Sequence, residues 1–257
     1  MNWPKNLLKW AFKMKKYRLD LHIHSVLSPC ADILMTPGNI IKEAEKKGIN
    51  IISITDHNVF GNIESAIKIA EEKDITVLPG IEVQSREEIH LLSYFNSLKD
   101  LKEYGKIIYE GLEGIKNDEE KFGAQILVDK NDEFVGKEEK LLLNSTKYSV
   151  EELVKITYQN NGIPVPSHAE RSFGIIQNLG FIPGDLEISF VEMNFHKTYE
   201  DYLKEFPYLK KYKLLKNSDS HYLNQIKPTM EIYLDEKPNS EKFFSYLKSH
   251  KIEEYLL

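Results

Sequence analysis

Short apolar runs alternate with amphipathic stretches along the chain, and this alternation predicts repeated β-strand and α-helix units. Strand-like runs occupy residues 18–24, 50–55, 76–78, 89–95, 163–166, 190–194, 212–216 and 230–234. Helical spacing of apolar residues predicts helices at about 37–47, 63–73, 98–115, 150–159 and 240–249. No repeat or linker divides the chain, so we expect a single α/β domain of the β/α-barrel kind.

Two of these helices carry explicit start signals. Thr36 stands at the N-cap of the first, with Pro37 at its first position and Gly48 just past its end. Ser149 and Glu152 have the spacing of a capping box before another helix. These signals predict helix starts that side-chain hydrogen bonds stabilise.

The alternation changes between residues 121 and 147. Two β-like runs, 124–128 and 140–143, flank the polar turn at 130–133. We interpret this segment as a β-hairpin inserted into the barrel. A lid that shapes specificity, a dimerisation element and a surface decoration all fit the pattern.

Residues 1–16 precede the first complete strand and form an amphipathic, Lys-rich stretch. Its apolar and basic positions, Leu7, Trp10, Ala11 and Met14 against Lys5, Lys9, Lys13 and Lys16, recur at helical spacing. This predicts a leader helix followed by one domain over residues 17–257. Such a helix can lie on anionic membranes, but we expect it to pack on the domain, with no stable membrane association.

Composition narrows the class of protein. Hydrophobic residues make up 41% of the chain and charged residues 29%, as in ordinary globular proteins. The net charge of −6 argues against a protein that grips long nucleic acid, whereas short strands and small substrates stay open. Cys30 is the single cysteine, so the chain cannot form an intramolecular disulfide. The chain also lacks the cysteine spacing of a thiolate zinc site. We therefore expect a cytoplasmic location and a packing role for this thiol.

Histidines and carboxylates lie where the predicted strands stop. The set consists of His22, His24, His57, Glu82, His90, His168, Asp219 and His221, and it includes six of the eight histidines. In a β/α barrel, side chains at the carboxyl ends of neighbouring strands converge on one face, so residues distant in sequence can share one site. Each residue alone fits a cap, an ion pair or a buried histidine, but together they predict a metal site.

Two pairs in this set have metal-ligand spacing. His22 and His24 project from the same side of a strand because side chains alternate with period two, and Asp219 and His221 repeat the arrangement. Such a pair offers two ligands to one ion without backbone distortion. Mixed imidazole and carboxylate ligation suits zinc, manganese or iron.

The segments around these residues resemble one known family. They are DLHIHS at 20–25, ITDHN at 54–58, PGIEV at 79–83, EIHLL at 88–92, PSHAERS at 166–172 and NSDSH at 217–221. In this order, across residues 18–223, they resemble the PHP (polymerase and histidinol phosphatase) family of metal-dependent phosphoesterases. The resemblance implies a distorted seven-stranded β/α barrel with two or three divalent ions ringed by about nine ligands.

The resemblance also implies roles for single residues. Glu82 is expected to bridge ions, and the ninth ligand is expected a few residues after the H-x-H pair, where family members carry His or Asp. Asp32, in SPCADILMTP, is the best match here, at a slightly longer spacing, and a third ion depends on it. Asp20 and Asp56 precede ligand histidines and either orient them or cap the local turns.

Metal ions close together lower the pKa of a shared water and stabilise charge on phosphoryl oxygens, so no protein nucleophile is needed. Arg171 is the candidate phosphate ligand, with a salt bridge to Glu170 or another acid as the alternative. His196 is the candidate proton donor to the leaving group, as is Glu192. A purely structural position is the alternative for both.

The leading functional hypothesis is a phosphatase of small phosphomonoesters such as histidinol phosphate, a sugar phosphate or a nucleotide. A phosphodiesterase or exonuclease on short nucleic acids and a protein tyrosine phosphatase are the alternatives within catalysis. A metal-stabilised module that binds a partner through the hairpin is the non-catalytic one. The sequence does not fix the oligomeric state.

Overall fold

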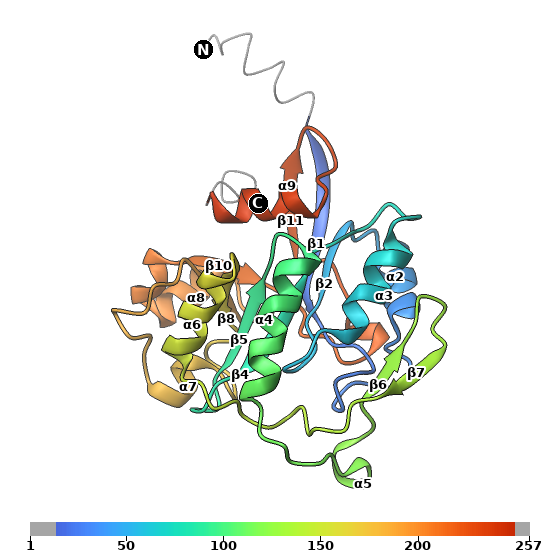
Figure 1. Cartoon of the computed structure of the whole chain (residues 1–257). Coiled ribbons are helices and arrows are strands. Elements are labelled where there is room, and N and C mark those ends of the chain that lie inside the picture. Colours follow the sequence, from blue (N-terminus) through green and yellow to red (C-terminus); the bar gives the residue numbers. More distant parts are fainter. Residues whose placement is uncertain (1–13, 250–257) are drawn as a thin grey trace.

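The computed structural model describes residues 14–249, in which most strands belong to three sheets (Figure 1). The first sheet has the order β11-β1-β2-β3, with β1 (Lys15–Ile23), β2 (Ile51–Ile54), β3 (Thr76–Val77) and β11 (Met230–Leu234). The second has the order β4-β5-β8, with β4 (Gly80–Gln84), β5 (His90–Tyr94) and β8 (Ile163–Pro166). The third pairs β9 (Phe190–Met193) with β10 (Lys213–Lys216).

Two isolated bridges connect these sheets around one end of the molecule. His57, after β2, pairs with Glu82 in β4, and Ile23 at the end of β1 pairs with Ser220 after β10. Both bridges are parallel, so the chain segments that leave β1, β2 and β10 come together. This arrangement gathers the predicted ligands at a single end of the strands.

The second sheet departs from a simple β/α repeat because it is antiparallel. The pattern does not predict β4 as a strand, yet β4 pairs with β5 over five residues, from Gly80 with Tyr94 to Gln84 with His90. His90 therefore begins its strand instead of ending it. Since β5 runs against β4, its first residue lies beside the last residue of β4, on the side of the site.

The predicted α/β class is confirmed. Hydrogen bonds divide the strands of residues 14–249 into separate sheets, so closure into a seven-stranded β/α barrel stays a prediction. Strands at 163–166 and 230–234 have the predicted bounds, and those at 190–194 and 212–216 differ by one residue at one end.

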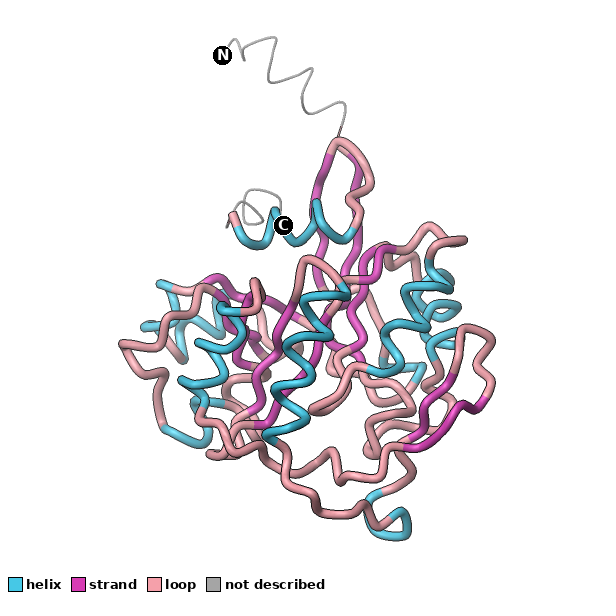
Figure 2. The backbone as a smooth tube through the Cα atoms, in the orientation of Figure 1, coloured by secondary structure: helices cyan, strands magenta, loops and turns pink. Residues whose placement is uncertain are grey.

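Helices cover the outside of these sheets (Figure 2). The longer ones are α2 (Pro37–Lys46), α3 (Gly61–Ala70), α4 (Leu98–Gly111), α6 (Val150–Gln159) and α9 (Ser240–Lys248). Shorter helical segments are α5 (Glu119–Phe122), α7 (Ile175–Leu179), α8 (Tyr199–Glu205), η1 (Pro207–Lys211) and η2 (Leu223–Gln225). The predicted caps are confirmed, because Thr36 accepts a hydrogen bond from Asn39 N–H and Ser149 and Glu152 form a capping box.

The alternation of β1 anchors the site in the core. Leu19 and Leu21 are fully buried in an apolar cluster that also holds Phe243 and Leu247 of α9. Side chains of neighbouring residues point to opposite faces of a strand, so His22 projects away from that cluster. Burying each leucine contributes roughly 1.5–3 kcal/mol and fixes the register that aims the histidine.

The inserted hairpin is shorter than its predicted form. It consists of β6 (Ile126–Val128) and β7 (Phe134–Lys137), and it lies against α3, where Ser65 donates a hydrogen bond to the carbonyl of Val128. The predicted strand at 140–143 is wrong. That segment is held instead by single hydrogen bonds, such as Leu141 N–H to the carbonyl of Ile115.

The predicted leader helix at 1–16 falls mainly on residues 1–13, which lie outside the described part of the chain. Lys15 and Lys16 belong to β1, so the helix does not extend to residue 16. No helix within residues 14–249 has the length and apolar character needed to cross a membrane.

Candidate metal centre

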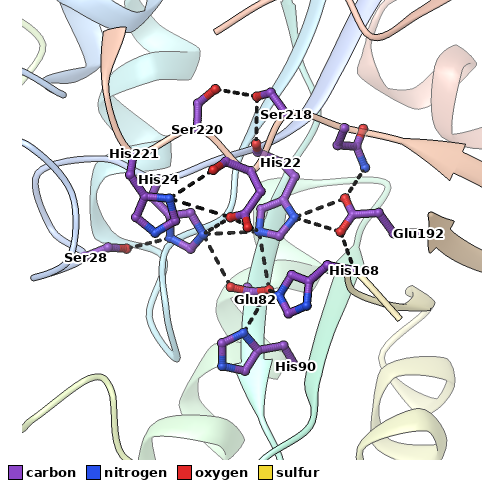
Figure 3. Close-up of polar contacts among 12 residues, drawn as sticks. His22, His24, Ser28, Glu82, His90, His168, Glu192, Ser218, Ser220 and His221 are labelled. Carbon is purple, nitrogen blue, oxygen red and sulfur yellow. Dashed lines mark hydrogen bonds and ion pairs between the residues drawn. The ribbon is translucent and has the colours of Figure 1, made fainter. Parts of the chain in front are cut away.

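The structure brings eight of the nine predicted ligands together at the strand ends, and all of these except His57 and Asp219 are labelled in Figure 3. They are His22 in β1, His24 just after it, His57 after β2, Glu82 in β4, His90 at the start of β5, His168 after β8, and Asp219 and His221 after β10. All are buried except Asp219 and His221, which are half-buried. The ninth, Asp32, is not among them.

The carboxylate of Glu82 lies at the centre of this cluster. Its Oε1 atom is 3.3 Å from His22 Nε2, 3.3 Å from His90 Nδ1 and 3.4 Å from His168 Nε2. Its Oε2 atom is 3.4 Å from His24 Nε2 and 3.2 Å from His57 Nδ1. A carboxylate with imidazoles around both oxygens has the position that a bridging ligand requires.

Hydrogen bonds on the far side of each ring fix which nitrogen can bind a cation. His22 Nδ1 lies 3.1 Å from both carboxylate oxygens of Glu192, so this nitrogen carries the proton. Ser28 Oγ donates to Asp56 at 2.6 Å and therefore accepts from His24 Nδ1 at 3.0 Å. In the neutral form of each ring, Nε2 therefore presents its lone pair to the cluster, as in metal-bound histidines.

Buried atoms without hydrogen-bond partners support a cation here. Among the described residues, Glu82 Oε1, His90 Nδ1 and His168 Nδ1 are buried and have none. His90 Nε2 is 3.2 Å from Gln84 Oε1, which accepts its proton and leaves Nδ1 as a lone pair toward Glu82. Each unsatisfied buried group costs about 1–3 kcal/mol, and a metal ion would remove that cost for Glu82 Oε1 and His90 Nδ1, whereas His168 faces Glu82 with its other nitrogen, Nε2.

Three groups of donors are compact enough to hold an ion each. Within each group all donor atoms lie within 4.8 Å of one another, and the groups are His22, His24 and Asp219; His57, Glu82 and His90; and His24, Cys30, His57 and His221. Imidazoles with carboxylates suit zinc, manganese or iron. The residues present therefore fit a cluster of divalent ions.

Charge and burial tune these histidines differently. Burial lowers the pKa of His57 well below its usual value, with the charge of His24 adding to the effect. Burial and His24 likewise lower the pKa of His221 to about 4. Burial opposes protonation of His24 too, but hydrogen bonds from its ring to the carboxylates of Asp219 and Glu82 outweigh burial and raise its pKa to about 9. The pKa of His22 is also raised, because Glu192 and Glu82 outweigh the opposing effect of burial. His22 and His24 therefore favour a bound cation, whereas His57 and His221 stay neutral.

Strained backbone positions surround the cluster. Asn58, His168, Phe173 and Asp219 have positive φ values of 56°, 28°, 63° and 52°, which residues with a side chain rarely adopt. The side chain of Asn58 also donates to the carbonyls of Leu142 and Asn144 and accepts from Gln84 N–H. It therefore connects the segment that follows β7 to β4. Strain of this kind is concentrated at functional sites.

Arg171 reaches the cluster through an ion pair. Its Nη2 atom is 2.6 Å from Asp219 Oδ2, and its side chain is 45% exposed. The acid in this salt bridge is Asp219 and not Glu170, whose carboxylate accepts from the hydroxyl of Tyr202. Arg171 also lines a pocket of about 450 Å³ together with His57, Glu82, His90, His168, Phe173, Asp219 and His221. Its role as phosphate ligand stays a prediction.

His196 is not brought to the cluster. Its backbone N–H binds the side chain of Asn194, its ring contacts Phe195, and the residue is exposed and not among those that line the pocket. Glu192, considered as a proton donor, is buried and accepts from Asn217 and from His168 N–H besides His22. It orients ligands, a role that the sequence alone does not reveal because it depends on burial.

Of the two predicted orienting carboxylates, only Asp56 reaches a ligand side chain, through Ser28. Asp20 binds the backbone and hydroxyl of Ser218 and so shapes the turn that carries Asp219.

Asp32 does not lie where a ligand is expected, and Cys30 does not lie where a packed residue is expected. The carboxylate of Asp32 accepts from Leu34 N–H at 2.9 Å and belongs to none of the metal-capable groups found in residues 14–249. The interpretation of Cys30 as a packed residue is wrong, because it is exposed and lines the pocket.

Known proteins resemble this chain in part of the sequence and most of the fold. A 5′-3′ exoribonuclease of Haemophilus influenzae is 32% identical over 81 residues, 30% of this chain and 28% of the relative. Endonuclease Q of Pyrococcus furiosus superposes with a TM-score of 0.70 and 18% identity over 91% of this chain and 56% of its own. A protein of Bifidobacterium adolescentis assigned to the metal-dependent phosphoesterases superposes with a TM-score of 0.54 and 16% identity. The superposition covers 92% of this chain and 95% of that protein.

The chain spans less than half of either curated relative that it matches, 46% in one case and 28% in the other. It covers just over half of Endonuclease Q.

The expectation that this protein does not bind long nucleic acid is wrong, because a protein of similar fold has been solved in complex with a 27-mer duplex substrate. Endonuclease Q bound to a 27-mer duplex with an abasic lesion superposes with a TM-score of 0.69 and 17% identity over 91% of this chain and 57% of its own. A fold of this kind therefore accommodates a duplex. A net charge of −6 does not exclude nucleic acid as a partner, because a local contact surface and bound cations can offset the overall charge.

The family model described as the PHP domain matches residues 20–251, which is nearly the whole described domain. The match contains every residue of the cluster around Glu82. From this match and the ligand geometry we conclude that the chain belongs to the PHP domain family of metal-dependent phosphoesterases.

Proposed function

We propose that this protein hydrolyses phosphodiester bonds of nucleic acids with metal ions held around Glu82. One observation carries the proposal: the metal-capable side chains and an exposed aromatic ring, that of Phe173, line the same pocket. Metal ions on these side chains would bind the phosphate, and the aromatic ring is suited to stacking on a base. The pocket therefore offers a partner for both the phosphate and the base of a nucleotide.

Phe173 has the geometry of a stacking platform. Its ring lies parallel to that of His90, with centroids 4.8 Å apart and an angle of 9° between the planes. Because 43% of the residue stays exposed and it lines the pocket, we infer that a base can stack on its second face. Base–aromatic stacking contributes about 1–3 kcal/mol per base and tolerates any sequence.

Other residues position the phosphate. Bound divalent ions would polarise the phosphoryl oxygens and lower the pKa of the attacking water. Arg171 would share its guanidinium between Asp219 and a phosphate oxygen, since guanidinium has five donors. Glu192 and Ser28 keep His22 and His24 in the orientation that ligation needs.

The relatives favour this class of substrate. Endonuclease Q and the exoribonuclease both have names that refer to nucleic acid cleavage.

A second candidate substrate, a small phosphomonoester, is favoured by the pocket itself. Its volume of about 450 Å³ suits one small ligand, and Arg171 is the sole Lys or Arg among the described residues that line it.

A substrate panel separates the two candidates. Zinc- or manganese-loaded protein is offered 5′-labelled single-stranded and duplex oligonucleotides, bis-p-nitrophenyl phosphate, p-nitrophenyl phosphate and glycerol phosphate. We expect higher kcat/KM on the diesters than on the monoesters. The reverse order would replace the proposal with the phosphomonoester function.

A stacking variant adds a second test. Phe173→Ala should raise KM for a single-stranded oligonucleotide roughly 5- to 150-fold, the equivalent of about 1–3 kcal/mol, and change KM for glycerol phosphate little. Phe181→Ala is the matched control, since Phe181 is 58% exposed and is not among the residues that line the pocket. Equal effects of Phe173→Ala on both substrates would rule out base stacking.

A further inference from the structure

The loop that follows His24 folds back toward the metal centre. Val26 N–H binds the carbonyl of Met35 at 2.7 Å, which closes the loop at its base. Asp32 N–H binds the carbonyl of His221 at 2.9 Å, which fastens its far side to a predicted ligand. The residues between these two contacts are therefore held beside the ring of His221, and Cys30 is one of them.

Cys30 and three histidines form one of the compact donor groups. The Sγ atom of Cys30 and the donor nitrogens of His24, His57 and His221 all lie within 4.8 Å of one another. In a tetrahedral zinc site, with bonds of about 2.3 and 2.1 Å, sulfur and nitrogen lie about 3.6 Å apart. Shifts of up to about 1 Å would complete such a site.

The other two groups account for most of the remaining ligands. His24 Nε2 is 3.1 Å from His22 Nε2 and 3.4 Å from Asp219 Oδ1, which places it with that pair. His90 and His168 both face Glu82 Oε1. His57 is shared with the group around Glu82, and a third ion beside it has His57, His221 and one further donor from the loop.

Two loop residues compete for that position, and their contacts decide between them. The carboxylate of Asp32 is engaged by Leu34 N–H, and its residue lies outside every metal-capable group within residues 14–249. The thiol of Cys30 belongs to one of these groups, and Cys30 lines the same pocket as His57 and His221.

We propose that the thiolate of Cys30, and not the carboxylate of Asp32, is the loop ligand of the third ion, together with His57 and His221. On binding, the S–H bond breaks, the proton passes to solvent, and sulfur donates a lone pair to the ion without any change of oxidation state. Sulfur and two imidazoles form a donor set that favours zinc over manganese. This inference rests on the metal centre of the proposed function but not on its substrate.

Cobalt titration tests the ligand directly, because a thiolate bound to Co²⁺ absorbs strongly in the near ultraviolet and a carboxylate does not. Metal-free protein is titrated with Co²⁺ as wild type, Cys30→Ala, Cys30→Asp and Asp32→Asn. We expect the sulfur band in wild type and Asp32→Asn, and its loss in both Cys30 variants. Cys30→Asp should still bind the third ion through its carboxylate, which separates lost ligation from misfolding.

Metal content and thiol protection complete the test. Zinc-loaded Cys30→Ala should retain about one ion fewer per chain than Asp32→Asn, and zinc should slow alkylation of the wild-type thiol by iodoacetamide at least 10-fold. A cobalt complex of wild type without the sulfur band, or an ion lost from Asp32→Asn but kept in Cys30→Ala, would overturn the proposal. Neither readout uses turnover, so a failure here is distinct from a failure of the proposed phosphodiesterase activity.

Discussion

The Nε2 atoms of His22 and His24 face each other at 3.1 Å while the Nδ1 atom of each ring is engaged on its far side. Two lone pairs this close repel unless a cation lies between or beside them. Asp219 Oδ1 stands 3.4 Å from both nitrogens and adds a third donor. The pair is therefore stable in this arrangement when a proton or a metal ion is bound.

Removal of the metal should destabilise the fold. Ions that bind the native state add about 4 kcal/mol to the free energy of unfolding when their free concentration is about 1,000 times Kd. Urea unfolding with zinc or manganese, and then with excess chelator, measures this difference. Superimposable unfolding curves would mean that the cluster binds no ion in solution.

Glu192→Gln should weaken metal binding without disrupting the domain. The neutral amide cannot replace the two carboxylate contacts to His22 Nδ1, so the ring loses basicity and orientation. Loss of such an orienting partner lowers metal affinity about 10- to 100-fold. Competition with a chromogenic chelator gives the affinity. Glu187→Gln, an exposed change in the segment before the same strand, is the control and should leave it unchanged.

Ser28→Ala should break the link between Asp56 and His24. It removes the acceptor for His24 Nδ1 and one donor to Asp56, and we expect a loss of about 1–3 kcal/mol in stability together with weaker metal binding. Ser53→Ala is the matched control, because Ser53 is fully buried but donates to the carbonyl of Leu78. An equal loss of metal affinity in both variants would argue against an orienting role for Ser28.

Metal affinity should rise with pH between 7 and about 9. In the metal-free protein burial lowers the pKa of His24, but Asp219 and Glu82 more than compensate and raise it to about 9. Below that pH the ring holds a proton, which the metal must displace, so binding at pH 7 should release protons. Calorimetry in two buffers of different ionisation enthalpy measures the release. Equal heats in both buffers would contradict this assignment.

The ligand positions were predictable because local periodicity determines them. The H-x-H spacing places His22 and His24 on one side of β1, and β1 forms because Leu19 and Leu21 need burial on the other side. The start of α2 at Thr36 was predictable for a similar reason, since its cap depends on residues close in sequence.

The remaining features depend on contacts between distant segments. β4 escapes prediction although Ile81 and Val83 alternate with Glu82 and Gln84, because the run is short and its antiparallel pairing with β5 depends on tertiary structure. The loop between Val26 and Met35 has no periodicity, so the sequence cannot tell that Cys30 lies in the pocket while Asp32 binds Leu34 N–H. The role of Glu192 arises from its burial beside His22, 170 positions away in sequence.

The rate of cleavage of a labelled oligonucleotide at increasing metal occupancy tests the central claim most directly. We predict no cleavage by chelated protein and recovery on addition of zinc or manganese in proportion to bound metal. Glu82→Ala should lose at least about 1,000-fold in rate at equal protein concentration. Cleavage that persists in excess chelator or in Glu82→Ala would contradict a metal-dependent phosphodiesterase centred on Glu82.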